Sequence, residues 1–466
     1  TTEIYTLSLH DALPISSSYA QWWTAFHDPV LNDLVQSAYE QNLSLREAGF
    51  RVLQARAQLG VARGEWFPQE QAHVGGYSAD GMSVNTANRH LTQERWFGQW
   101  DYGFSLAWEL DFWGRFRRAI EASEATLDAS VEEFDDVLVT LLGDVAANYV
   151  QYRTVEQRIA YAQENVRVQR QILELATARF KGGQASELDV NQSQSDLSNT
   201  EALIPRLRIS LREANNRLCI LLGEPRVDLH SRLGTGPIPA APPEVAVDIP
   251  AALLGRRPDV RRAERAAAAQ CAQIGVAQAD FYPQILINGT VGWSAQDLGH
   301  LFSSRSFTGS VGPGFRWHIL NYGRILNNVR WQDARFQELA VAYQQTLLRA
   351  NEEVEEGLVR FLESQEEVQA LTVSVSAAQR SVEEAVAQYQ GGLTDFNRVA
   401  VLQERLVQRQ EQLAQAQGDV ALGLVNVYRA LGGGWQIRTR APAETALGAT
   451  APPEGAPPEG RRAAWH

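Results

Sequence analysis

The sequence holds little of what a metal centre or a nucleic-acid surface needs. Its 466 residues include one methionine, two cysteines and eight histidines, and Lys181 is the one lysine. Cys219 and Cys271 lie in separate Ala- and Leu-rich stretches without metal-ligand spacing, so we interpret both as small buried side chains. The formal net charge is -13, and no cluster of Lys and Arg dominates a long stretch. We therefore expect no metal, no cofactor and no nucleic-acid partner.

Two further absences narrow the function. No zinc-protease, nucleophile-elbow or P-loop motif occurs, and the acidic residues mostly fall on helical solvent faces, so we expect no catalytic residue and no enzyme. No run approaches the ~18 to 20 apolar residues that a membrane-spanning helix requires. If the chain crosses a membrane, it must do so as strands closed into a barrel.

Both ends of the sequence are set apart from the fold. Residues 1–16 begin with TTEIYTLSLHDALPI, which reads like a translated sequencing-library adapter and lacks the layout of a signal peptide. We expect this segment to be non-native; a signal peptide, and any lipid-bearing cysteine after it, would then have occupied the missing region. Residues 436–466 contain APPEGAPPEG, a composition that predicts a disordered tail.

The chain is an internal duplication. Three segments return later in the chain at an offset of 215 or 209 residues: GVARGEWFPQ at 60–69 and GVAQADFYPQ at 275–284, WELDFWGR at 108–115 and WHILNYGR at 317–324, and the glycine pairs at 182–183 and 391–392. Such a period is far longer than that of a solenoid. We therefore predict two structural repeats, 17–232 and 251–435, joined by a Pro- and Ala-rich linker at 233–250.

Each repeat predicts a helix, two strands, a very long helix, a Gly turn and a returning helix. Residues 115–181 and 324–390 contain no proline and one glycine each, and apolar residues recur every three or four positions in 138–166. A helix of that length would reach roughly 100 Å, which is too long for a compact globule. We interpret these segments as coiled-coil helices.

Aromatic residues mark the strands. In WDYGFSLAWELDF at 100–112, the even positions are aromatic or Leu and the odd positions are largely polar. Residues 285–294 and 307–319 alternate similarly, and 69–79 is assigned as the fourth strand by its place in the repeat. One face suits lipid and the other suits water. Because even small barrels use about eight strands, closure would require an oligomer.

These features resemble the outer-membrane efflux protein family, the TolC-like outer-membrane factors, and within it the NodT-like lipoprotein branch. The matching segments include WWTAFHDPVLNDLV from residue 22, WELDFWGRFRRA at 108–119 and LLGRRPDVRRAE at 253–264. The resemblance implies a homotrimer in which four strands per protomer form a twelve-stranded outer-membrane β-barrel, in contact with lipid. The long helices would continue it as a periplasmic α-barrel. It also implies a passive duct served by a periplasmic adaptor protein and an inner-membrane pump of the RND type.

The resemblance assigns roles to the Gly turns. Arg179, Gly183 and Ser186 match the family's R-x-x-x-G-x-x-S/T turn, which receives the adaptor. In the second repeat a glycine matches, but Gln388 stands where arginine would be, so the two kinds of adaptor groove should differ in charge. The expected docking residues at the tip are Arg179, Gly182, Gly183, Ser186, Gly391 and Gly392.

A second set of tip residues concerns closure of the duct. Asp189 and Tyr389 match the positions of a link in which a phenol donates to a carboxylate. A second family link is absent, because Thr394 replaces its arginine and Leu188 stands at the partner position, and Val401 lies near the place of a common acidic constriction. The resemblance therefore implies a closed state held by few polar links, in which Asp189 and Tyr389 form the candidate gate. Capping of a helix dipole is the alternative role for Asp189.

Two alternative functions remain open at this stage. A periplasmic coiled-coil scaffold or adaptor would explain the helices but not the aromatic strands, and the duct of a type I protein secretion system would share the same architecture. The transported substrate is not encoded in any motif, since the partner pump usually sets specificity. With one methionine, a methionine-lined copper path is disfavoured, and drug-like compounds are the commonest cargo of the family.

Overall fold

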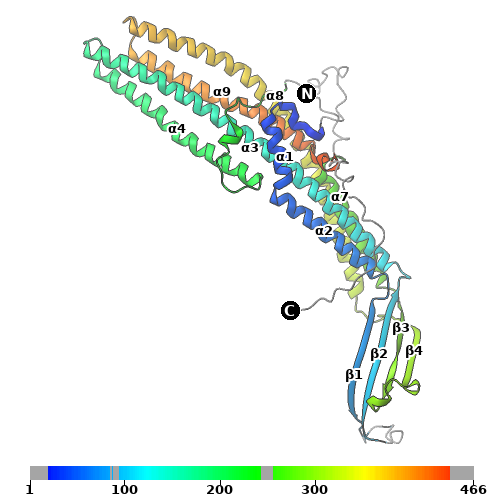
Figure 1. The fold of residues 1–466 in the computed structure, drawn as a ribbon. Helices are drawn as coiled ribbons and strands as arrows, with labels where there is room; N and C mark the ends of the chain where they lie inside the picture. Colours follow the sequence, from blue (N-terminus) through cyan, green and yellow to red (C-terminus); the bar gives the residue numbers. More distant parts are fainter. Residues whose placement is uncertain (1–18, 84, 86, 88–93, 243–254, 441–466) are drawn as a thin grey trace, which may run out of the picture.

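The protein is elongated, with a sheet at one end and long helices at the other (Figure 1). The computed structural model describes residues 19–83, 85, 87, 94–242 and 255–440. The proposed adapter segment at 1–16, residues 243–250 of the expected linker and the tail beyond residue 440 lie outside the described residues.

The elements follow the predicted order in each half of the chain. The first half comprises η2 (Tyr19–Phe26), α1 (Pro29–Gln41), α2 (Leu43–Gly64), β1 (Glu70–Gly81), β2 (Trp96–Leu110), α3 (Arg115–Lys181), α4 (Glu187–Leu221) and α5 (His230–Leu233). The second half comprises α7 (Pro258–Ala279), β3 (Gln284–Ala295), η4 (Leu298–His300), η5 (Ser304–Ser306), β4 (Phe307–Arg316), α8 (Arg324–Gln390), α9 (Phe396–Ala430) and η6 (Trp435–Arg440). The bounds of α3 and α8 agree with those predicted from the sequence.

The four strands form one antiparallel sheet in the order β1-β2-β3-β4. The register places Tyr102 opposite Trp293, and Trp293 opposite Phe307, so the aromatic positions of three strands share one face. On the other face Ser294 Oγ donates to Asp101 Oδ1 at 2.8 Å. The sheet is therefore apolar on one face and polar on the other, as the alternation predicted.

The strands end earlier than the alternation suggested. β2 stops at Leu110 and β4 at Arg316, whereas the sequence pattern ran to residues 112 and 319. Asp111 leaves the strand because its carboxylate accepts from the backbone N–H of Phe116 at 3.0 Å and of Arg117 at 3.2 Å, which satisfies free donors in the first turn of α3. The sequence pattern extended beyond the ends of β2 and β4 because the turns that follow also contain aromatic residues.

The helices lie side by side in a curved layer (Figure 1). Away from the sheet, α3 packs on both α4 and α9, and α9 packs on α8, giving the order α4-α3-α9-α8. Nearer the sheet the order is α2-α3-α7-α8. One edge of the layer is therefore α8 along its whole length, and the other edge is α2 followed by α4.

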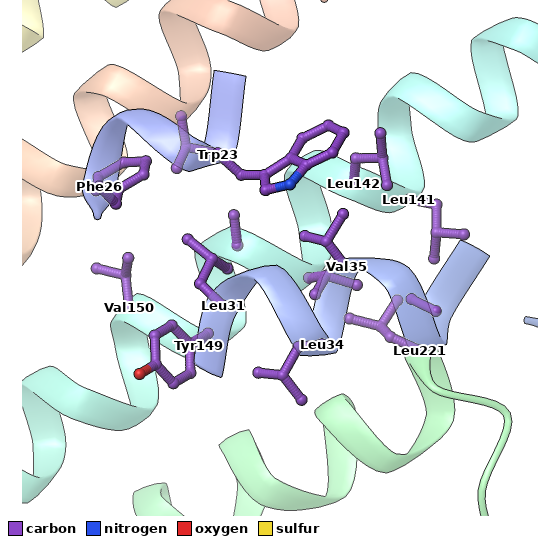
Figure 2. Close-up of a cluster of buried hydrophobic side chains, with 14 of the residues drawn as sticks. Trp23, Phe26, Leu31, Leu34, Val35, Leu141, Leu142, Tyr149, Val150 and Leu221 are labelled. Carbon is purple, nitrogen blue, oxygen red and sulfur yellow. The ribbon is translucent and has the colours of Figure 1, made fainter. Parts of the chain in front are cut away.

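The main hydrophobic core lies where the two halves of the chain meet. Figure 2 shows Trp23 of η2 pointing toward Leu142 of α3, whereas Leu34 of α1 points toward α4; Leu31 and Tyr149 belong to the same buried cluster. Full burial of each such side chain is worth about 1.5–3 kcal/mol, so this cluster anchors the helical layer. The buried guanidinium of Arg153 donates to the carbonyl oxygens of Leu233 and Gly234 at 2.7 Å, and it holds the chain after α5 against the core.

Two sequence predictions need correction. Cys219 is buried, but Cys271 is exposed on α7, where it does not join the buried alanines of that helix. The expected disordered tail began at residue 436, yet Trp435–Arg440 forms η6, and Arg438 donates to both carboxylate oxygens of Asp135 at 2.8 and 2.9 Å. Burial of Asp135 beside this arginine makes the start of the tail part of the fold.

Among the described helices, none has the length and apolar character that a membrane span requires.

Candidate functional site

The tip of the helical layer is built from two turns of the same geometry. At the end of α3, Gly183 has φ +71°, and the N–H of Gln184 donates to the carbonyl of Arg179 at 2.9 Å. At the end of α8, Gly392 has φ +72°, and the N–H of Leu393 donates to the carbonyl of Gln388 at 2.9 Å. A left-handed residue with these bonds ends a helix and satisfies its last carbonyls, which is why the second glycine of each pair is needed.

The returning helices start with different caps. Ser186 Oγ accepts from the N–H of Asp189 at 3.2 Å, and the two side chains also hydrogen-bond at 2.8 Å, which forms a capping box at the start of α4. In α9 the equivalent cap is Asp395, whose carboxylate accepts from the N–H of Arg398 at 3.1 Å. The first tip is thus capped by a neutral hydroxyl and the second by a charged carboxylate.

Replacing one glycine of the first turn separates backbone strain from packing. We expect Gly183→Ala to destabilise the tip by about 1–2 kcal/mol, because an L-residue is strained at φ +71° although nothing lies within 4 Å of the added Cβ. Gly182→Ala is the matched control, since Gly182 has ordinary helical angles. Hydrogen exchange at residues 184–190 measures the difference, and equal protection in both variants would contradict this reading of the turn.

A small hydrophobic cluster ties the two hairpins together just behind the turns. It joins Ile172 and Ala176 of α3 to Tyr389 of α8 and to Phe396 and Val399 of α9. Tyr389 is 3% exposed, and its ring meets the ring of Phe396 edge-on at 5.6 Å. Tyr389 is therefore a core residue of the tip and not a surface residue.

The guanidinium of Arg179 covers the ring of Tyr389. Its carbon Cζ lies 4.6 Å from the ring centroid, within the range of a cation–π contact. Burial raises the pKa of the Tyr389 phenol, the negative charge of Asp189 raises that pKa further, and Arg179 opposes both effects. The phenol is therefore neutral at physiological pH.

The sequence-predicted tip residues are brought together in part. Arg179 and Tyr389 are in contact across the two hairpins, whereas the Asp189 carboxylate is hydrogen-bonded by Ser186. Tyr389 Oη is buried and has no hydrogen-bond partner among the described residues, so no bond joins it to Asp189 in this conformation. Gly182 and Gly391 have helical angles at the C-caps of α3 and α8.

Apolar side chains beside the turns were not singled out from the sequence. Leu393 is 82% exposed, and Leu188 and Phe180 are also exposed. Their signal was available, because each is a large apolar residue within a few positions of a Gly pair. Exposed apolar groups at both turns, next to Arg179 and Lys181, give the tip a mixed apolar and basic surface. In the described part of the chain, no group of three or more His, Cys, Asp or Glu is placed to hold a metal ion.

Comparison with known proteins covers nearly the whole chain. The sequence model described as outer membrane efflux protein matches residues 34–224 and 249–433, one match in each half. The pyoverdine export outer membrane protein OpmQ of Pseudomonas putida is 30% identical over 425 residues, which cover 89% of this chain and 88% of that protein. Nodulation protein T of Rhizobium leguminosarum bv. trifolii is 29% identical over 415 residues, with the same coverage of 89% and 88%. The solved structure of the outer-membrane channel OprN aligns with a TM-score of 0.85 at 30% identity, and covers 90% of this chain and 93% of that one.

Proposed function

The chain belongs to the outer membrane efflux protein family, and from this membership we propose that it works as a homotrimer that docks a periplasmic adaptor protein joined to an inner-membrane RND-type pump. It is an efflux duct of the outer membrane, with its helices extending into the periplasm. The edges of the helical layer and the open sheet support the trimer. The tip supports the docking surface and the gate.

The observation that carries the trimer is the opposite charge of the two layer edges. The α8 edge is acidic, with six exposed glutamates that have no ion-pair partner among the described residues: Glu352, Glu355, Glu356, Glu363, Glu366 and Glu367. The α4 edge carries four exposed arginines: Arg206, Arg208, Arg212 and Arg217. Apolar side chains accompany both sets, with Val359 and Leu362 exposed on α8 and Ile209 on α4. Such edges complement each other in a head-to-tail ring.

The two charged stretches also lie at the same level of the layer. Asp144 of α3 pairs with Arg429 of α9 at 3.3 Å and faces Arg217 of α4 at 3.9 Å. Two residues from Arg429, Val427 packs on Gly357 of α8. Arg217 of α4 therefore lies at the same height along the helical layer as residues 356–357 of α8.

Closer to the tip, residues of α4 and α8 also lie at matching heights along the layer. Val155 of α3 packs with Leu207 of α4, and the neighbouring Thr154 contacts Gly418 of α9. Because Gly423 of α9 meets Phe361, Gly418 corresponds to position 366 of α8. The arginines at 206–217 and the glutamates at 356–367 therefore occupy the same range of heights along the helical layer, on its opposite edges. In a symmetric ring, the arginines of one copy can then contact the glutamates of the next.

The sheet supports the same assembly. β1 and β4 are its outer strands, and each has an unpaired edge. Unpaired edges favour pairing with another copy. Three copies would pair β4 of one with β1 of the next into twelve strands, with the aromatic face toward lipid and Asp101 and Ser294 toward the solvent-filled interior.

We propose that the adaptor docks on the tip through the sequence-predicted set Arg179, Gly182, Gly183, Ser186, Gly391 and Gly392. The exposed Phe180, Leu188 and Leu393 support this by supplying apolar contact area. The Gln388 position lacks the charge of Arg179, so two kinds of docking groove are proposed, one more basic than the other. We also propose that Asp189 and Tyr389 belong to the gate that closes the duct.

The cargo class follows from the pump and not from this chain. The relative from Pseudomonas putida is named for pyoverdine export, and a solvated duct of this kind suits small organic molecules such as drugs. Neither the tip nor the sheet carries a cluster that would select a metal ion among the described residues.

Membrane fractionation tests the proposal directly. Residues 17–466, expressed behind a lipoprotein signal, should be extracted from the outer-membrane fraction by detergent and should migrate as a trimer. Crosslinking between the α8 and α4 edges of different copies should then be detected. A soluble monomer would overturn the proposed assembly.

A further inference from the structure

We infer that Tyr322 of one copy stacks on Phe67 of the next, and that the junction between the two repeats within one chain is the template for this contact. The inference rests on the proposed ring of copies, and it adds the side chains and the strand register that join neighbouring copies. The contact lies at the end of the sheet nearest the helices, which we call its foot.

Within one chain, the turn after β2 is held against the segment that precedes β3. The ring of Trp113 stacks on that of Tyr282, with centroids 4.5 Å apart and an interplanar angle of 17°, and Trp113 Nε1 donates to the carbonyl of Pro283 at 2.8 Å. Beside this stack, Arg115 Nη1 lies 4.0 Å from Asp280 Oδ1. The first repeat is thus joined to the second by a stack and an ion pair.

The aromatic counterparts of this stack are exposed at opposite edges of the sheet. At the repeat offsets of 209 and 215 residues, Tyr322 corresponds to Trp113, and Phe67 corresponds to Tyr282. Tyr322 follows β4 and is 95% exposed, whereas Phe67 precedes β1 and is 63% exposed. Because β1 and β4 are the outer strands, these two rings can meet only between copies.

The charged counterparts match as well. Arg324 corresponds to Arg115, and Glu65 corresponds to Asp280. Both are exposed, and in the described part of the chain neither has an ion-pair partner. A ring that brings Tyr322 to Phe67 would therefore also bring a guanidinium to a carboxylate.

The two repeats have the same local geometry at the foot of the sheet. Trp108 Nε1 donates to the carbonyl of Trp66 at 3.2 Å. Its counterpart Trp317 donates to the carbonyl of Phe281 at 3.0 Å. In a closed ring, β4 meets β1 of the next copy as β2 meets β3 within the chain. Like units in like positions are expected to make like contacts.

The helices beside the sheet show the same open position. A Cβ added at Gly275 of α7 would lie 2.9 Å from Arg118 Cγ of α3, so these helices approach closely. At Gly60 of α2, the counterpart of Gly275, an added Cβ would have nothing within 4 Å. This face of α2 is therefore free to receive α8 of a neighbouring copy.

The strand register requires one adjustment, because β1 is one residue out of step with the repeat. At Pro68 the offset to the second repeat is 215 residues. In the first hairpin Glu70 lies opposite Ala107. In the second hairpin Gln284 lies opposite Arg316. Since the two partners are 209 residues apart, Glu70 is the counterpart of Gln284, at an offset of 214.

With this adjustment the register between copies is determined. Trp108 of β2 lies opposite Ile287 of β3. Their counterparts are Trp317 and His73, so Trp317 of one copy should lie opposite His73 of the next, on the aromatic face. Within its own chain the ring of His73 stacks on Phe104 at 4.6 Å. Trp317 would extend this row of rings across the boundary between copies.

Disulfide crosslinking tests the register in a background with both native cysteines replaced by alanine. Purified trimer that carries Arg316→Cys and Val74→Cys should crosslink between copies on mild oxidation, because residues directly opposite each other have Cα atoms about 4.5–5.5 Å apart. Arg316→Cys with Ala72→Cys or with Gly76→Cys is the matched control. These pairs are about 7–8 Å apart and should crosslink several-fold less. Preferred crosslinking of Arg316→Cys to His73→Cys would overturn the register.

Trimer dissociation in detergent tests the stack. Tyr322→Ala and Phe67→Ala should each raise the concentration at which the trimer dissociates by about tenfold, and the double variant should add little, because either substitution removes the same contact. Phe112→Ala removes a ring of similar exposure outside the inferred pair, and it should leave dissociation unchanged. Fully additive effects, or no effect of either substitution, would overturn the stack.

The two experiments separate this inference from the proposed function. If the wild type is a monomer in detergent, the proposed assembly fails and the inference fails with it. If the wild type is a trimer but crosslinks at another register, or dissociates independently of Tyr322 and Phe67, the inference alone is wrong.

Discussion

Reversing three glutamates of the α8 edge is expected to abolish the trimer. In the variant Glu363→Arg, Glu366→Arg, Glu367→Arg, each interface of the proposed ring would exchange attraction to the α4 arginines for repulsion. At about 0.2–1 kcal/mol per exposed pair, repeated in three interfaces, the summed change reaches several kcal/mol. Size analysis in detergent should then show monomers at low salt, where charge interactions are least screened.

A charge swap makes this expectation specific. The variant Arg206→Glu, Arg208→Glu, Arg212→Glu should also fail to assemble alone, and the six substitutions together should restore the trimer, because each reversed edge then meets a reversed partner. Reversal of Glu174 and Glu404 on the inner helices α3 and α9 is the control, and it should leave assembly intact. Failure of the six-fold variant to reassemble would contradict the contact between the α8 and α4 edges.

The second large effect concerns the core that joins the two repeats. Trp22 is 1% exposed, and its ring stacks on Tyr428 of α9 at 5.4 Å. Trp22→Ala should lower the unfolding free energy by about 3–5 kcal/mol, because it leaves a large cavity between η2 and α9. Thermal unfolding followed by circular dichroism measures the shift.

Two other variants separate packing from hydrogen bonding at this site. Trp22→Phe should lower the unfolding free energy much less than Trp22→Ala does. It keeps a ring and removes an Nε1–H that has no hydrogen-bond partner among the described residues. Trp96→Ala, at an exposed position at the start of β2, should be nearly neutral. Equal losses of unfolding free energy in Trp22→Ala and Trp22→Phe would show that ring packing is not what stabilises the fold at Trp22.

The long helices and two-faced strands were predictable because their signals are local and repeated. The absence of proline from 115–181, the 3.6-residue apolar spacing and the Gly pair define α3 without reference to the rest of the chain. The same holds for the aromatic alternation of β2. The ends of the strands were less accurate, because the capping contact of Asp111 depends on the geometry of the helix that follows.

The contacts at the tip could not be predicted from local sequence patterns. The sequence placed Arg179, Asp189 and Tyr389 near the turns, but it did not show which pair would meet, since Arg179 and Tyr389 lie a full repeat apart in the chain, at the ends of α3 and α8. Ser186 competes for Asp189 within one turn, and this short-range capping box leaves the phenol without that partner. The balance between a local cap and a distant link is settled by packing.

By itself, the sequence determined the duplicated plan, the helix lengths, the two faces of the strands and the membership of an outer-membrane transport family, because periodic patterns and Gly turns act over a few residues. Only the tertiary structure decided the lateral order of the helices, and hence that the acidic stretch of α8 and the basic stretch of α4 occupy opposite edges at one level. It also decided that Arg179 covers Tyr389. Both depend on contacts between residues far apart in the chain, for which no local pattern exists.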